Sequence, residues 1–205
     1  MGGRTVSELS LVLGMDLVQL QALFDEARKL TKHTEFVVVG SLSILGIVQG
    51  RDIPAEMLMS IDVDCYFNRD PGRIFELKGT LGEGSHFEGE HGYYLDPIAP
   101  EVPTLPEQWQ FRLIRVPLER DIVVLFLDPN DAAVSKYARC DVRDRKWIRA
   151  GLKAGLLSAP IIESRFRQTS FLNNEERERA YKALTEDRAA LQPMATDQSR
   201  IADAR

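Results

Sequence analysis

The sequence predicts an α/β protein in which a mixed sheet is flanked by helices. Two observations support this fold class. Short β-branched runs, such as EFVVV at 35–39 and DIVVLFL at 121–127, alternate along the chain with segments of helical periodicity. The chain has 205 residues, of which 44% are hydrophobic and 28% charged, the composition of an ordinary globular protein. This balance excludes a wholly disordered chain and a disulfide-stapled miniprotein.

Residues 1–33 are predicted to form an N-terminal helical segment. Thr5 and Glu8 have the spacing of a capping box, and Asp16 is placed to cap a second helix. An apolar stripe follows at helical spacing, as expected for a helix that packs on a core. The stripe consists of Leu17, Leu20, Leu23, Phe24, Ala27 and Leu30.

Residues 34–131 are predicted to form an α/β core. The strand at 35–39 ends in Gly40-Ser41, and SLSILGIV then favours a helix. In SIDVDCYF at 60–67, apolar residues, Ile61 among them, alternate with polar ones, so Asp62 and Asp64 should point to the same side of a strand.

The second half of this core carries turn, loop and strand signals. NRDPGRIFELKG predicts a turn followed by a helix, and 83–90 is expected to be an acidic loop. HGYYL predicts a strand that stops at Asp96-Pro97, and FRLIRV and DIVVLFL predict two more. Asp128 and Asp131 are best explained as turn and helix-cap residues.

Residues 132–192 are predicted to be a C-terminal helical region, and 193–205 a mobile tail. One long helix should run from Ala132 to about Leu157, and another should begin at Asn174 and end before Pro193. The segment 132–182 holds 12 basic and 6 acidic residues, a net +6, whereas the rest of the chain carries −11. Such a basic segment fits either a polyphosphate or nucleic-acid surface or a solvated helix face.

The residues with the clearest chemical pattern are Gly40-Ser41 and the Asp62-Val-Asp64 strand. Carboxylates at positions i and i+2 of a strand project in parallel, and their repulsion is costly unless a cation lies between them. Mg²⁺ binds through such carboxylates together with substrate phosphates. A Gly-Ser turn before a helix offers backbone N–H groups and a hydroxyl to phosphate oxygens. The alternative is that Asp62 and Asp64 form the solvent-exposed face of an edge strand and that Gly40-Ser41 is an ordinary turn.

These motifs resemble the nucleotidyltransferase-fold superfamily, in which a hydrophobic strand ends in Gly-Gly or Gly-Ser and Asp-x-Asp follows on the next strand. Here the motifs are VVVGS at 37–41 and DVD at 62–64. The sequence is most similar to bacterial nucleotidyltransferase-like families of unknown function that are related to abortive-infection and toxin–antitoxin nucleotidyltransferases. The similarity covers most of residues 35–157.

The resemblance implies further site residues. Asp96 corresponds to a third metal-binding carboxylate, although a turn-capping role before Pro97 is the alternative. Lys136, Arg143 and Asp144 correspond to a phosphate-binding set on the helix after the sheet, expected on one helical face with Cys140 and Trp147. Asp141 stands where similar proteins carry an Arg, so the alternative of a solvated, salt-bridged face stays open.

The resemblance also implies an activity. Asp62 and Asp64 would bind two Mg²⁺ or Mn²⁺ ions, and Asp96 would hold the second ion or act as a base. A nucleoside monophosphate would move from an NTP to an unknown acceptor, a tRNA or a protein, while Gly40, Ser41 and Lys136 stabilise the phosphates. The enzyme could be a toxin with an antitoxin partner. The alternative is a catalytically silent module that binds a nucleotide or a partner.

The sequence carries neither a membrane-length apolar run nor a secretory signal at its N-terminus. We therefore expect a cytoplasmic protein with no membrane partner.

Overall fold

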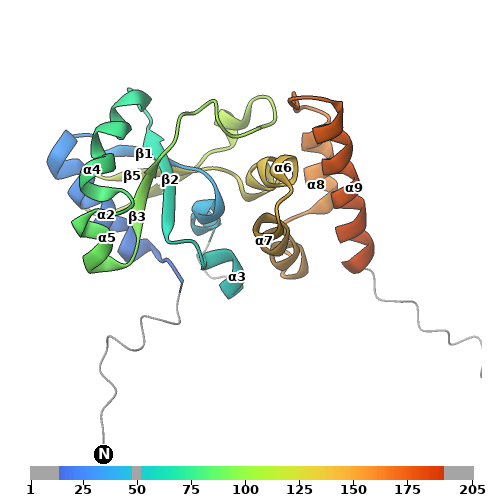
Figure 1. The fold of residues 1–205 in the computed structure, drawn as a ribbon, viewed down its shortest axis with the longest axis horizontal. Helices are drawn as coiled ribbons and strands as arrows, with labels where there is room; N and C mark the ends of the chain where they lie inside the picture. Colours follow the sequence, from blue (N-terminus) through green and yellow to red (C-terminus); the bar gives the residue numbers. More distant parts are fainter. Residues whose placement is uncertain (1–13, 48–51, 192–205) are drawn as a thin grey trace, which may run out of the picture.

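The computed structural model describes residues 14–47 and 52–191. The Thr5/Glu8 capping box and the predicted mobile tail at 193–205 lie outside the described residues. The central element is a five-stranded sheet of order β3-β2-β1-β5-β4 (Figure 1). Its strands are β1 (Glu35–Val38), β2 (Asp62–Phe67), β3 (Tyr94–Pro97), β4 (Ile114–Pro117) and β5 (Val123–Phe126).

The sheet is mixed, as the sequence predicts. β1 pairs with β2 in the antiparallel sense and with β5 in the parallel sense. β2 and β3 are parallel, and their register places Asp64 opposite Asp96. β4 closes the other edge antiparallel to β5. This strand order brings two acidic positions, distant in sequence, to adjacent strands.

Helices lie at two places relative to the sheet (Figure 1). One group lies around the β3 end: α2 (Leu17–Thr31), α4 (Lys78–Leu81) and α5 (His86–His91). The other group packs together at the opposite end of the molecule: α6 (Pro129–Arg139), α7 (Val142–Lys153), α8 (Ala159–Phe166) and α9 (Asn174–Leu191). The 3₁₀ helices are η1 (Ser41–Ile47), η2 (Pro71–Leu77) and η3 (Trp109–Arg112). The short helix α3 (Ala55–Leu58) precedes β2 and packs against η1 and the C-terminal helix α7.

Helix α2 illustrates how the N-terminal pattern folds. Asp16 caps it through a reciprocal capping box with Gln19, as the sequence predicts for Asp16. The predicted stripe is largely buried, and Phe24 stacks on Phe36 of β1 with ring centroids 4.0 Å apart. Leu30, at the end of the stripe, is exposed. Among residues 14–47 and 52–191, each helix is too short or too polar to cross a membrane.

The single long helix predicted for 132–157 is wrong, because the chain breaks it in two. α6 ends at Arg139, and Cys140 adopts a left-handed conformation with a φ of 58°. The Asp141 side chain then accepts a hydrogen bond from the backbone N–H of Asp144 and caps α7. The acidic residue at 141 is therefore explained locally, because a helix N-terminus favours an aspartate and disfavours a cation.

Smaller corrections concern the core. The helix predicted after Gly40 is the 3₁₀ helix η1, and the helix predicted after Pro71 is η2 followed by α4. The predicted acidic loop contains α5, whose N-cap Ser85 accepts from the backbone N–H of Glu88. Helix α8 lies in the predicted helical region 132–192, although no separate helix is predicted at its position.

The Asp residues that follow β5 have different roles. Asp128 caps α6, as predicted. Asp131, predicted as a cap, is instead fully buried and pairs with Arg112 at 2.7 Å. The predicted division of the chain at 33, 131 and 192 stays a prediction, although α9 does begin at Asn174 and is described to Leu191.

Candidate metal and phosphate site

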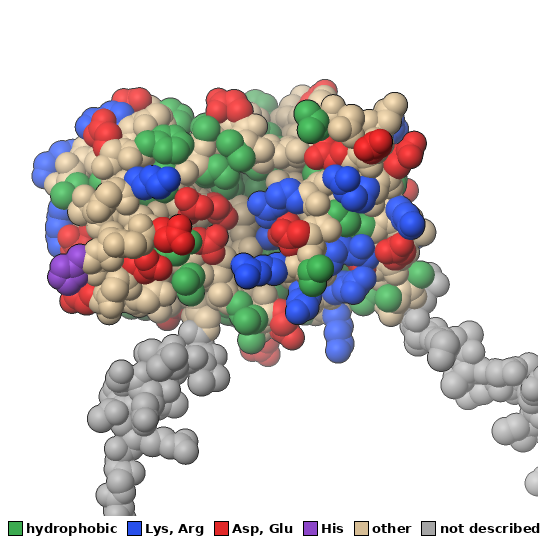
Figure 2. Space-filling view, in the orientation of Figure 1, with side chains coloured by type: hydrophobic (Ala, Val, Ile, Leu, Met, Phe, Trp, Pro, Cys, Tyr) green, Lys and Arg blue, Asp and Glu red, His purple; other side chains and the backbone are tan. Residues whose placement is uncertain are grey.

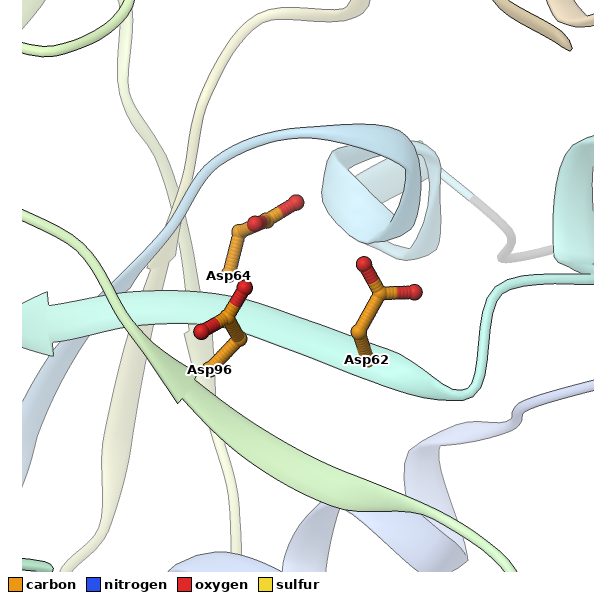
Figure 3. Close-up of side chains that lie close together, drawn as sticks. All are labelled: Asp62, Asp64 and Asp96. Atoms are coloured by element: carbon orange, nitrogen blue, oxygen red, sulfur yellow. The ribbon is translucent and has the colours of Figure 1, made fainter. Parts of the chain in front are cut away.

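Three carboxylates meet at one point of the sheet. Asp62 and Asp64 lie on β2 and Asp96 on β3, and ligand oxygens of all three lie within 4.8 Å of one another. Figure 3 shows the side chains rising from the two adjacent strands on the same side. Asp62 and Asp64 share a side because they are two residues apart on a strand. Asp96 joins them through the parallel register of β2 and β3.

Asp96 lies inside β3 and not in the turn after it. The strand runs from Tyr94 to Pro97, so the turn-capping alternative does not describe its position. All three aspartates are partly accessible. They form a cluster of hard oxygen donors that could hold a divalent metal such as Mg²⁺.

The loop after β1 fits closely against this cluster. Gly40 has a φ of +66°, and a Cβ atom at this position would lie 2.0 Å from Oδ2 of Asp64. A side chain would therefore displace the carboxylate. The backbone N–H of Val39 donates to the carbonyl of Asp64 at 2.9 Å, which fixes the loop against β2. Only glycine satisfies both the left-handed conformation and this close approach.

Burial and neighbouring negative charge raise the pKa of two carboxylates of the cluster. Burial, followed by the charges of Asp62 and Asp96, raises the pKa of Asp64 to about 7, while Lys136 and Arg139 oppose the shift. Burial and the charge of Asp62 also raise the pKa of Asp96. Carboxylates whose ionised forms repel one another gain most from a bound divalent cation. The donor set and its charge thus fit a metal.

A buried ion pair lies beside the acidic cluster. Lys136 and Asp144 are each 3% exposed, and Nζ of Lys136 lies 2.7 Å from Oδ1 of Asp144. The same Nζ donates to Oγ of Ser41 at 2.9 Å and lies 5.0 Å from the ring centre of Trp147. Asp144 also accepts two hydrogen bonds from Arg139. The pair therefore connects the C-terminal helices to the Gly40-Ser41 loop.

Trp147 holds the same loop from the other side. Its Nε1 donates to the carbonyls of Ser41, at 3.2 Å, and Met57, at 3.3 Å. The hydroxyl of Ser41 and the ammonium of Lys136 thus have fixed positions next to Asp62 and Asp64. An oxyanion placed between these groups would meet a hydroxyl and a cation.

The predicted phosphate-binding set is not on one helical face, because α6 and α7 are separate helices. Lys136 on α6 and Asp144 and Trp147 on α7 nevertheless meet through the turn at Cys140. Arg143 is exposed on α7 and lines an open pocket that also contains Ser41, Asp62 and Lys136. These residues are therefore brought together by the packing of two helices and not by their spacing on one helix.

Sequence reasoning missed Arg139. This residue lines a second, smaller pocket together with Gly40, Asp64 and Lys136, and it pairs with Asp144. A signal for it existed in the sequence. Asp141 precedes Asp144 by three residues, the spacing of an N-cap, and recognition of that cap would have ended the previous helix at Arg139.

Comparison with known proteins agrees with the geometry. The model of the family DUF6036, described as a nucleotidyltransferase of unknown function, matches residues 18–192. No curated protein and no solved structure matches the chain. The family description mentions no toxin or antitoxin, so the expected toxin–antitoxin relation stays a prediction.

Proposed function

Because the chain belongs to DUF6036, a family of nucleotidyltransferases of unknown function, we propose that it transfers a nucleoside monophosphate from an NTP to an acceptor hydroxyl. The observation that carries this proposal is the cluster of Asp62, Asp64 and Asp96 directly beside the Gly40-Ser41 loop. An acidic metal site next to a phosphate-binding turn is what nucleotidyl transfer requires.

The three aspartates would hold one or two divalent ions, Mg²⁺ or Mn²⁺. When bound, the metal would neutralise phosphate charge and lower the pKa of the acceptor hydroxyl. The Ser41 hydroxyl and the Lys136 ammonium would bind the β- and γ-phosphate oxygens, with Arg143 at the pocket wall as a further cation. Asp144 would act as a positioning residue, because its ion pair with Lys136 fixes the orientation of the ammonium.

The reaction needs only the NTP and the acceptor hydroxyl. The acceptor oxygen forms a bond to the α-phosphorus, the bond from that phosphorus to the bridging oxygen of the β-phosphate breaks, and pyrophosphate leaves. The acceptor proton passes to a carboxylate, for which we propose Asp96, because burial and the charge of Asp62 raise the pKa of Asp96 above its ordinary value. The acceptor could be a tRNA or a protein.

Two measurements test this function. Each NTP with Mg²⁺ is titrated calorimetrically into the wild type and into the Asp62→Asn, Asp64→Asn double variant. The matched control is Asp70→Asn, Asp121→Asn, because both positions are exposed and their left-handed backbone suits asparagine. We expect Mg²⁺-dependent binding in the wild type and the control, and at least a hundredfold weaker binding in the site variant.

An NTP labelled at the α-phosphate separates an active enzyme from a silent binding module. We expect label to enter the RNA or the protein fraction of a cell extract with the wild type and not with the site variant. Nucleotide binding without label transfer would support the catalytically silent alternative. Binding that is unchanged by Mg²⁺ and by the double substitution would contradict the proposed site.

A further inference from the structure

A large open pocket extends from the acidic cluster toward α3 and α7. Its volume is about 590 Å³, within the usual range of small-molecule sites. Ser41, Asp62 and Lys136 line its inner end, so a triphosphate bound there would direct the rest of the nucleotide into this space. The pocket on the other side of Lys136 measures only about 80 Å³. The larger pocket therefore has the room that a nucleoside needs.

One wall of the large pocket is apolar and exposed. Met59 is 73% exposed and Ile61 is 51% exposed, although the alternation of the strand predicts that Ile61 is buried. Strand β2 begins only at Asp62, so Ile61 lies outside the sheet and its side chain contributes to the pocket wall. Apolar side chains left uncovered beside a polar site commonly mark the place of a ligand's apolar face. The flat face of a nucleobase would cover them.

Besides Asp62, Lys136 and Asp144, the pocket is lined by three further charged side chains, which come from two helices. Arg143 and Lys146 belong to α7, and Glu56 belongs to α3. Within the described residues, none of the three takes part in an ion pair. The pocket therefore holds a carboxylate and two cations that are available to a ligand. The two cations suit phosphate oxygens, which leaves Glu56 for a group that donates hydrogen bonds.

We propose that this pocket holds the nucleoside of the NTP and that Glu56 selects bases with an exocyclic amino group against uracil. The inference rests on the proposed function. A carboxylate only accepts hydrogen bonds, and adenine, cytosine and guanine each carry an amino group that donates them. Uracil has no amino group, and its single ring N–H is flanked by two carbonyl oxygens that repel a carboxylate. Glu56 is thus a specificity-determining residue.

The test is a calorimetric titration of ATP, CTP, GTP, UTP and inorganic tripolyphosphate, each with Mg²⁺, into the full chain. The variants are Glu56→Gln and, as a matched control, Glu178→Gln on the exposed face of α9. In the wild type, at least one amino-bearing NTP should bind about tenfold or more tightly than UTP, because a hydrogen bond to a base edge discriminates against a base that lacks the donor. The ratio should fall toward one in Glu56→Gln and persist in Glu178→Gln, with tripolyphosphate binding equally to all.

Three results would overturn the inference, and they differ from failure of the proposed function. The first is an affinity for UTP equal to or higher than that for the other NTPs, and the second is a ratio that persists in Glu56→Gln. A third result is that Glu56→Gln changes the preference for ribose over 2′-deoxyribose and leaves base preference intact, which would assign Glu56 to the sugar. In each case tripolyphosphate still binds. Absence of binding by tripolyphosphate and all NTPs would reject the nucleotide site as a whole.

Discussion

The acidic cluster on the sheet and the C-terminal helices beside it carry charge in opposite ways. On the sheet side, Asp62, Asp64 and Asp96 place like charges within 4.8 Å of one another. On the helical side, Lys136 and Arg139 share Asp144 as a common partner. Figure 2 shows acidic side chains of one side facing Lys and Arg side chains of the other across a hollow.

Because of this difference, the acidic side contributes to ligand binding and the helical side contributes to stability. The acidic side keeps a repulsion that a cation would relieve, so it costs stability in the metal-free protein and favours a ligand. On the helical side the cations are paired with Asp144 within the protein, and Lys136 holds the Gly40-Ser41 loop before any ligand binds. Substitutions on the two sides should therefore change the free energy of unfolding in opposite directions.

The largest effect is expected for Asp144→Ala. Removal of this carboxylate leaves the ammonium of Lys136 buried without its ionic partner, which costs about 3–5 kcal/mol of unfolding free energy. Urea unfolding of the variant measures the loss. The control is Lys136→Met with Asp144→Leu, which removes both charges and should restore most of the stability while nucleotide binding stays lost. A single variant as stable as the wild type would contradict the coupling.

A somewhat smaller effect is expected for Gly40→Ala. The new Cβ would lie 2.0 Å from Oδ2 of Asp64 at a φ of +66°, so we expect a loss of about 3 kcal/mol and at least tenfold weaker Mg²⁺ binding. Gly84→Ala is the matched control, because Gly84 has a φ of +77° with no atom within 4 Å of its Cβ position. It should lose only about 1 kcal/mol and retain the metal. Equal losses in the two variants would reject the close approach to Asp64.

The smallest effect has the opposite sign and belongs to Asp64→Asn. The pKa of Asp64 is raised in the folded protein to about 7 from an ordinary 3.8, so the folded state binds the extra proton between these pH values. The metal-free wild type should therefore lose stability as pH rises from about 4 to 7, and the variant should lack this loss. The shift corresponds to about 4 kcal/mol at most, and because Asp64 is partly accessible to solvent, which screens its charge, we expect the variant to be more stable at pH 8 by on the order of 2 kcal/mol.

The measurement is urea unfolding in a chelator at pH 4, 6 and 8. Addition of Mg²⁺ should reverse the order at pH 8, since the metal stabilises only the protein that binds it. Parallel pH profiles of the two proteins would contradict the proposed repulsion among the carboxylates.

Local patterns in the sequence determined much of the fold and two of the three aspartates of the acidic cluster. The alternation at 60–67 places Asp62 and Asp64 on one side of β2, and Asp16 caps α2 as predicted, because both features depend on neighbouring residues alone. The Gly40-Ser41 turn after β1 follows from the same local signals. The break at Cys140 was also encoded locally, in the Asp141 cap, but helical periodicity obscured it.

Only the tertiary structure decided which distant residues meet. Asp96 joins Asp64 through the order and register of β2 and β3, and Lys136 reaches Asp144 and Ser41 through the packing of α6, α7 and η1. Glu56 and Ile61 enter a pocket because α3 lies against α7 and β2 begins after Ile61. Periodicity fixes the direction of a side chain within one element, whereas these contacts depend on strand order and on burial that many distant residues share.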